Sequence, residues 1–141
     1  MQNQIKQSWF FRQSQQEVWE YLTNPELIGQ WLAKTDFEPL VGHKFSFSNK
    51  SGKFVDCEVL EVKPFTNLSY SWNYPSANDG NRVDSKVTWT LVPKESGTEL
   101  QLVHNDFISL EDFTAHSKGW NNCLTKFEEL INQTQDANAN T

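Results

Sequence analysis

Cysteine is scarce in this 141-residue chain, and its two copies lie far apart. Cys57 and Cys123 form neither a CxxC pair nor a disulfide framework, which predicts two reduced thiols. The three histidines and two cysteines lack metal-ligand spacing, so neither a metal nor another cofactor is expected. A nucleophile elbow, a phosphate-binding glycine loop and an HExxH motif are also missing, which removes the catalytic classes that depend on them.

Positive charge and long apolar runs are scarce as well. Twelve Lys and Arg residues stand against eighteen Asp and Glu residues, which gives a net charge of −6. Because this charge repels phosphate backbones and anionic lipid, no nucleic-acid or membrane-surface partner is expected. No apolar run approaches about 18 residues, which excludes membrane insertion by a helix. Residues 1–6 lack the apolar segment of a signal peptide, which predicts a cytoplasmic location.

Aromatic residues, by contrast, are abundant. Ten Phe, six Trp and three Tyr residues make up 13% of the chain. Aromatic side chains in this number either fill a core or line a cavity for an apolar ligand. The chain length suits one domain with one core, placed over residues 1–131. The polar residues 132–141 are expected to form a flexible tail.

The N-terminal quarter predicts one strand and two short helices. Alternation of apolar and polar residues indicates a strand over residues 4–11. Ser14 and Glu17 then have the spacing of a capping box, in which each side chain bonds the backbone amide of the other at a helix start. A second short helix is expected over residues 25–31, because proline suits the first helical position.

The remainder predicts a series of strands followed by one long helix. Residues 44–107 alternate with a period of two, which indicates antiparallel strands with a bulge at Val59-Leu60. Residues 109–131 form a helix, because apolar residues recur there at spacings of three and four. These residues are Phe113, His116, Trp120, Leu124, Phe127 and Ile131. The predicted class is α+β, with a curved antiparallel sheet of six to seven strands wrapped on the long C-terminal helix and two short helices between strands one and two.

Several segments, in order along the chain, resemble one protein superfamily. Residues 18–27 read VWEYLTNPEL and precede Gln30-Trp31, which resembles the opening of the START/polyketide-cyclase-like helix-grip superfamily with its Bet v 1-like fold. The branch named after the activator of the heat-shock-protein-90 ATPase is the most similar. Further matching segments are GHKF at residues 42–45, EVKP at 61–64, LSYSW at 68–72, GTEL at 97–100 and GW at 119–120. The resemblance spans residues 5–130 and implies a helix-grip fold, in which the sheet and the last helix enclose an apolar cavity.

Three tryptophans are expected to surround one volume. Trp72 and Trp89 lie on strands and Trp120 on the long helix, while His104 and His116 share the inward-facing pattern of their own elements. The alternative for the tryptophans is a packed aromatic core, and for the histidines a hydrogen-bonded position in the core or at a pocket rim. No catalytic residue is assigned. The candidate ligand-binding residues are Trp31, Phe45, Phe47, Trp72, Trp89, Leu102, His104, Phe113, His116 and Trp120.

Three functions fit these residues and the resemblance. The leading hypothesis is non-catalytic binding of a small hydrophobic molecule, of the lipid, polyketide or flavonoid kind, by a monomer or weak dimer. The first alternative is a cyclase- or dehydratase-like enzyme, which predicts a solvent-accessible cavity histidine paired with a second polar group. The second is an accessory protein that contacts a chaperone, which predicts an exposed apolar or charged patch outside the cavity.

Two positions on the long helix carry expectations of their own. Gly119 lies inside the helix, where glycine costs about 1 kcal/mol relative to alanine. Either close contact with the sheet or room for a ligand would compensate for this cost, and the first is favoured, so that a methyl group at 119 overpacks the site. Asp112, with Asp106 and Glu111, is interpreted as an ordinary acidic residue beside the helix N-terminus.

Overall fold

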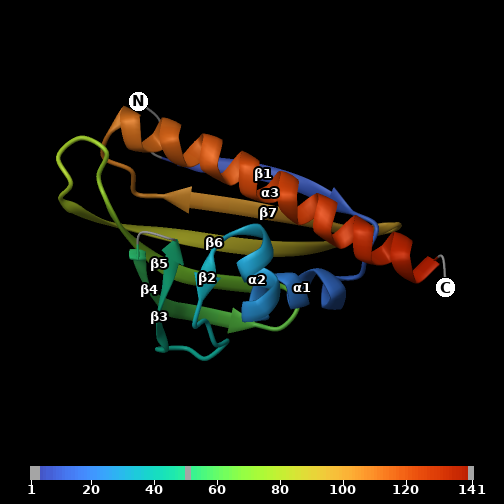
Figure 1. The fold of residues 1–141 in the computed structure, drawn as a ribbon. Helices are drawn as coiled ribbons and strands as arrows, with labels where there is room; N and C mark the ends of the chain where they lie inside the picture. Colours follow the sequence, from blue (N-terminus) through green and yellow to red (C-terminus); the bar gives the residue numbers. More distant parts are fainter. Residues whose placement is uncertain (1–3, 50–51, 140–141) are drawn as a thin grey trace.

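The computed structural model describes residues 4–49 and 52–139. These residues form seven strands and three helices in an α+β arrangement (Figure 1). The elements are β1 (Ile5–Phe11), α1 (Gln15–Thr23), α2 (Pro25–Trp31), β2 (Lys34–Thr35), β3 (Lys44–Asn49), β4 (Gly52–Lys63), β5 (Asn67–Pro75), β6 (Arg82–Lys94), β7 (Gly97–Asn105) and α3 (Leu110–Ala139). The predicted helix-grip fold is confirmed, including the two short helices that follow the first strand.

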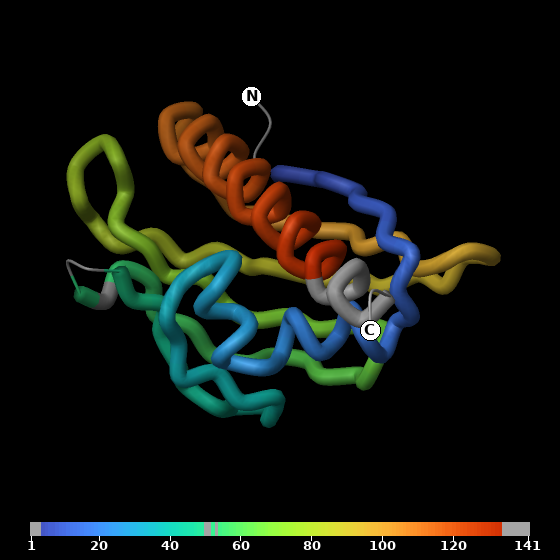
Figure 2. The backbone as a smooth tube through the Cα atoms, turned by 45° about the vertical axis from the view of Figure 1, so that its right-hand side comes forward, coloured from blue at the N-terminus to red at the C-terminus, as the bar shows by residue number. Residues whose placement is uncertain are grey.

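All seven strands belong to one antiparallel sheet. Their order is β1-β7-β6-β5-β4-β3-β2, so the first strand pairs with the last, while β1 and β2, which are consecutive in the sequence, lie at opposite edges. The sheet curves around α3, which crosses one of its faces, and the two short helices lie beside the C-terminal half of α3 (Figure 2). One face of the sheet is thereby covered, which satisfies the need of its alternating apolar side chains for burial.

The helix starts follow the sequence pattern. The Ser14 hydroxyl accepts from the Glu17 amide at 3.2 Å, and the Glu17 carboxylate accepts from the Ser14 amide at 3.4 Å, so the capping box is confirmed. At α2, the Asn24 side chain accepts from the Glu26 amide at 3.0 Å, with Pro25 in the first turn. At the start of both short helices, a side chain therefore accepts a hydrogen bond from a backbone amide that has no partner within the helix.

The predicted bulge in β4 is present. Val59 lies opposite Tyr70 and Glu61 lies opposite Ser69, so Leu60 is an extra residue in the ladder between β4 and β5. Its side chain is 43% exposed, whereas Val59 is buried. From Val55 to Val59 the odd-numbered residues of β4 face the core, and after the bulge the alternation is shifted by one residue while the strand continues.

Helix α3 is longer than predicted. Its backbone continues to Ala139, beyond the expected end at residue 131, and the Ser109 hydroxyl accepts from the Asp112 amide at 3.1 Å at its start. Asn140 and Thr141 lie outside the described residues, and the flexibility of residues 132–141 stays a prediction.

The centre of the fold is filled by aromatic side chains. Trp31 packs edge-on against Trp89, with ring centroids 6.0 Å apart, and against Phe127 at 5.0 Å. Its indole N–H donates to the Tyr21 carbonyl at 2.9 Å, and the Trp89 N–H donates to the Tyr70 hydroxyl at the same distance. With their polar atoms paired, these rings are a closed core rather than the wall of a cavity.

Candidate functional site

A pocket of about 310 Å³ lies between α3, strands β4 and β5, and the end of α2. Exposed residues at its edge, Pro75, Ala115 and Gly119, show that it opens to solvent. Among the residues whose side chains the structure describes, the lining contains four aromatic side chains (Phe, Trp or Tyr) and no lysine, arginine, aspartate or glutamate. The lining residues are Leu32, Phe54, Val55, Trp72, Tyr74, Pro75, Ala115, His116, Gly119, Trp120 and Cys123.

The walls follow from the periodicities of strand and helix. Along β5, Trp72 and Tyr74 are two residues apart and so face the same side of the sheet, toward α3. On α3, Ala115, Gly119 and Cys123 are each one turn apart and form one stripe beside Trp120. Two of these three side chains are small and one is absent, which leaves the space that the pocket occupies.

His116 forms part of the pocket wall with both ring nitrogens occupied. Its Nε2 accepts from the Trp72 indole N–H at 3.2 Å, and its Nδ1 lies 2.9 Å from the Asp112 carbonyl oxygen. A carbonyl oxygen only accepts, so the proton of the neutral ring is on Nδ1. Burial lowers the pKa of His116, and the hydrogen bond to the Asp112 carbonyl and the Asp112 charge oppose that shift.

His104 lies behind this wall, fully buried. Its Nδ1 accepts from the Trp120 indole N–H at 2.9 Å, and its Nε2 lies 2.8 Å from the Ser85 hydroxyl, which donates to the Trp72 carbonyl at 2.7 Å. These partners fix a neutral ring with its proton on Nε2. Burial, together with the neighbouring His116, lowers the pKa of His104 to about 2.

Asp112 has a larger role than its position near a helix start indicated, and the interpretation as an ordinary acidic residue at a helix end is corrected. Its buried carboxylate accepts from the Tyr74 hydroxyl at 3.1 Å, the Ser76 hydroxyl at 2.9 Å and the Ala77 amide at 2.7 Å. Burial alone would raise its pKa, but these bonds and the Ser109 hydroxyl hold the pKa below its ordinary value. We call Asp112 and its three donors the Asp112 cluster.

The Asp112 cluster positions the pocket mouth. It joins the first turn of α3 to the end of β5 and the start of the β5–β6 loop, which lies next to that turn in Figures 1 and 2. Because the Tyr74 hydroxyl is held by Asp112, its ring stays against His116, with centroids 4.5 Å apart. Burial and the adjacent Asp112 charge raise the pKa of Tyr74.

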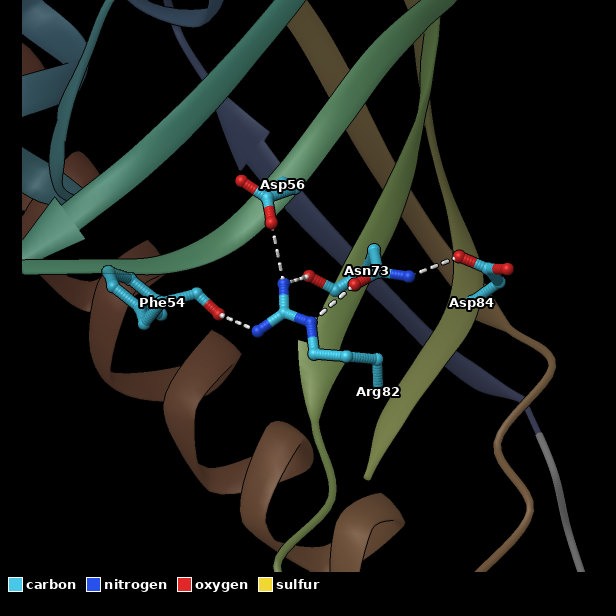
Figure 3. A network of polar contacts seen from close by, with 5 residues as sticks. All are labelled: Phe54, Asp56, Asn73, Arg82 and Asp84. Carbon is cyan, nitrogen blue, oxygen red and sulfur yellow. Dashed lines mark hydrogen bonds and ion pairs between the residues drawn. The ribbon is translucent and has the colours of Figure 1, made fainter. Parts of the chain in front are cut away.

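On the opposite face of the sheet, Arg82 joins three strands at the end that carries Phe54 (Figure 3). Its guanidinium contacts the Asp56 carboxylate at 2.9 Å, the Asn73 side-chain oxygen at 2.6 Å and the Phe54 carbonyl at 3.5 Å. The Asn73 side chain also donates to Asp84. Because Asn73 lies between the inward-facing Trp72 and Tyr74, this network faces away from α3. It fixes the strand ends behind the pocket.

The structure brings three of the ten predicted ligand-binding residues to the pocket: Trp72, His116 and Trp120. The other seven do not line it. His104 lies one layer behind, and Phe113 packs half-buried against Phe107 with centroids 6.0 Å apart. Five are buried in the core: Trp31, Phe45, Phe47, Trp89 and Leu102. An inward-facing side chain meets either packed neighbours or a cavity, and parity alone does not distinguish the two.

Eight lining residues were absent from the sequence-based set: Leu32, Phe54, Val55, Tyr74, Pro75, Ala115, Gly119 and Cys123. One signal for them was present in the sequence. Ala115 and Gly119 are small residues one helical turn apart on the face that carries Trp120, and Tyr74 has the same parity as Trp72.

The expectation of close packing at Gly119 is wrong. A Cβ built on this residue meets no atom within 4 Å, and the residue is exposed at the pocket edge. The glycine therefore leaves open space beside Trp120 rather than admitting a strand. Of the two explanations for a glycine inside this helix, room for a ligand is the one that its surroundings match.

Two further features bear on the class of site. Within residues 4–49 and 52–139, no group of three or more His, Cys, Asp or Glu side chains is arranged to hold a metal ion. None of the helices in that part of the chain is both long and apolar enough to span a membrane.

A curved antiparallel sheet that encloses one long helix, with an apolar pocket between them, defines a helix-grip domain. The family model described as "Activator of Hsp90 ATPase homolog 1-like protein" matches residues 4–132. The chain therefore belongs to this family, as its sequence resemblance indicated.

Solved structures extend the comparison. The chain is similar to protein MLL2253 from Mesorhizobium loti, at 35% identity over 93% of this chain and 98% of that one, with a TM-score of 0.85. It shares the fold of DynU16, a protein of the dynemicin biosynthetic locus, at 20% identity over 94% of this chain and 48% of that one, with a TM-score of 0.82. CalU16 from Micromonospora echinospora has 23% identity over 91% and 75%, with a TM-score of 0.77. No curated protein sequence matches the chain.

Proposed function

We propose that this protein binds a small hydrophobic molecule in the pocket between α3 and the sheet, without catalysing a reaction. The observation that carries the proposal is an open pocket of about 310 Å³ whose wall is aromatic and aliphatic. Small-molecule sites are concave, mostly apolar and about 300–1,000 Å³ in volume, which places this pocket at the small end of the range.

The hydrogen bonding of the two histidines supports binding over acid–base catalysis. A general base needs an unoccupied nitrogen within reach of the substrate proton. Both nitrogens of His116 are bonded within the protein, and His104 has no position on the pocket wall. The cyclase-like alternative, which needs an available cavity histidine, therefore has less support.

Substitution at Gly119 tests the proposal. Gly119→Leu adds a side chain at the pocket edge beside Trp120 and should occupy the ligand volume, whereas Gly119→Ala adds one methyl group in open space. Equilibrium dialysis with an uncharged aromatic probe, naphthylmethanol, measures binding to both variants and to the unmodified protein.

The expected result is similar affinity for the unmodified protein and Gly119→Ala, and loss of binding for Gly119→Leu. Mass-resolved alkylation locates the probe independently, since Cys123 lines the pocket and Cys57 is buried in the core. Bound probe should slow the modification of Cys123. Equal affinity of Gly119→Leu and the unmodified protein would show that the probe binds elsewhere and would contradict the proposal.

A further inference from the structure

We infer that the pocket selects uncharged ligands and excludes carboxylates, so that a free fatty acid or an aromatic acid is not its occupant. This inference rests on the proposed function and narrows its ligand class. A buried ligand carboxylate needs either a cation or unoccupied hydrogen-bond donors, because an unpaired charge is costly to remove from water. Neither is available in the described wall of the pocket.

The side-chain donors of the wall are already in use. The Trp72 indole N–H donates to His116, the Trp120 indole N–H donates to His104, and the Tyr74 hydroxyl donates to Asp112. The Nδ1–H of His116 donates to the Asp112 carbonyl, and among the described side chains of the lining the Cys123 thiol is the remaining polar group. A thiol is a weak donor, and burial raises the pKa of Cys123, which keeps it uncharged at neutral pH.

Arg82 is hydrogen-bonded to the backbone of a lining residue, but its guanidinium is unavailable to a ligand in the pocket. Its guanidinium bonds the backbone carbonyl of Phe54, but from the face of the sheet opposite the pocket (Figure 3). There its charge is paired with Asp56 at 2.9 Å, and its Nε and Nη2 groups also donate to the side chain and backbone of Asn73. A ligand in the pocket would have to cross the sheet to reach it.

A negatively charged side chain bonds directly to a residue of the pocket wall. The Asp112 carboxylate bonds the hydroxyl of Tyr74, whose ring lines the pocket, and hydrogen bonds hold the pKa of Asp112 below its ordinary value. The whole chain carries a net charge of −6. A ligand carboxylate would therefore meet repulsion in addition to its desolvation cost.

Three probes with one ring system and different charges test the inference: naphthylmethanol, naphthoate and naphthylmethylamine. Equilibrium dialysis at neutral pH measures each affinity, and protection of Cys123 from alkylation locates each probe. Naphthylmethanol is expected to bind at least about tenfold more tightly than naphthoate, since an unpaired buried charge costs more than 1.4 kcal/mol. It should also bind more tightly than the amine. Equal or tighter binding of either charged probe with Cys123 protected would overturn the inference.

A substitution that supplies the missing cation gives a second test. Ala115 lines the pocket at its exposed edge, so Ala115→Lys places an ammonium group there, and Thr114→Lys places the same charge on the next, exposed residue outside the lining. Ala115→Lys should improve naphthoate binding about tenfold, whereas Thr114→Lys should not. If both variants bound naphthoate more tightly by the same factor, the weak binding of carboxylates would come from the net charge of the protein and not from the pocket wall, and the inference would be overturned.

The failure of this inference is distinguishable from that of the proposed function. If the pocket binds no small molecule, none of the three probes will protect Cys123, in the unmodified protein or in the variants. If the pocket binds but does not select by charge, all three probes will protect Cys123 with similar affinity.

Discussion

Acidification should destabilise this protein through His104. In the folded state the ring is neutral, because its Nδ1 already accepts from Trp120 and a second proton there would point at an N–H group. Its pKa is about 2 when folded, against an ordinary value of 6.5 when exposed. Below pH 6.5 the unfolded chain therefore binds a proton that the folded chain does not, and the stability falls as the pH falls.

The size of the effect follows from that difference. Each pH unit between the two pKa values removes a little over 1 kcal/mol from the free energy of unfolding, which amounts to about 2–3 kcal/mol between pH 7 and pH 4.5. The stabilisation from the neutral ring is fully present above pH 6.5. Asp112 contributes over a different pH range. Because its pKa is lower in the folded state, the stabilisation from its ionised carboxylate is lost only as the pH falls below about 3.8. Measurements that stop at pH 4.5 therefore isolate the histidines.

Urea unfolding at several pH values, for the unmodified protein and His104→Gln, measures the effect. Glutamine does not titrate, and its amide can accept from Trp120 and donate to Ser85 as the imidazole does. His116 remains in both proteins, so the difference between their pH profiles belongs to His104. We expect the unmodified protein to lose about 2–3 kcal/mol more than the variant between pH 7 and pH 4.5. Profiles that run parallel would refute the assignment of a buried neutral ring.

Three further outcomes are expected. Gly119→Ala should raise the free energy of unfolding by about 1 kcal/mol in thermal or urea melts, because a methyl group there meets open space; a loss of stability would show hidden crowding. Ser14→Ala should cost about 0.5–2 kcal/mol, and Ser14→Asp, which keeps an acceptor, should cost less; equal losses would mean that the side-chain acceptor does not stabilise the helix start. Asp112→Asn should lower the free energy of unfolding by about 1–3 kcal/mol at neutral pH, and Glu111→Gln, on the exposed side of the same turn, should change it little. Similar values for the two variants would show that the Asp112 cluster stabilises the fold no more than an exposed acidic residue does.

The features that the sequence predicted are those that depend on neighbouring residues. The capping box needs only Ser14 and Glu17, and the bulge at Leu60 appears as a change of parity within one strand. The interior position of His104 followed from its parity with Leu102 in the same way. Each of these signals is contained in a few consecutive residues, so no knowledge of the folded contacts was required.

The features that the sequence did not predict depend on residues far apart in the chain. Trp89 and Trp120 are both inward-facing, but only Trp120 lies beside a glycine and an open volume, whereas Trp89 is closed in by Trp31. Asp112 carries the local signature of a helix start, and its actual donors lie 35 to 38 residues earlier. Local pattern gives the direction of a side chain, and the tertiary fold decides what it meets.

The Asp112 cluster also has a consequence for the order of folding events. It joins Ser76 to Asp112, 36 positions later, and the whole β6–β7 hairpin lies between them. Closing this long loop costs less conformational entropy once the hairpin has formed, because the hairpin brings the two ends closer together. We therefore expect the pocket mouth to assemble late, after the central strands have paired. We also expect the pocket mouth to open more readily than the paired central strands, so the Ala77 amide, which bonds the Asp112 carboxylate, should exchange with solvent deuterium faster than the amides of β6 and β7.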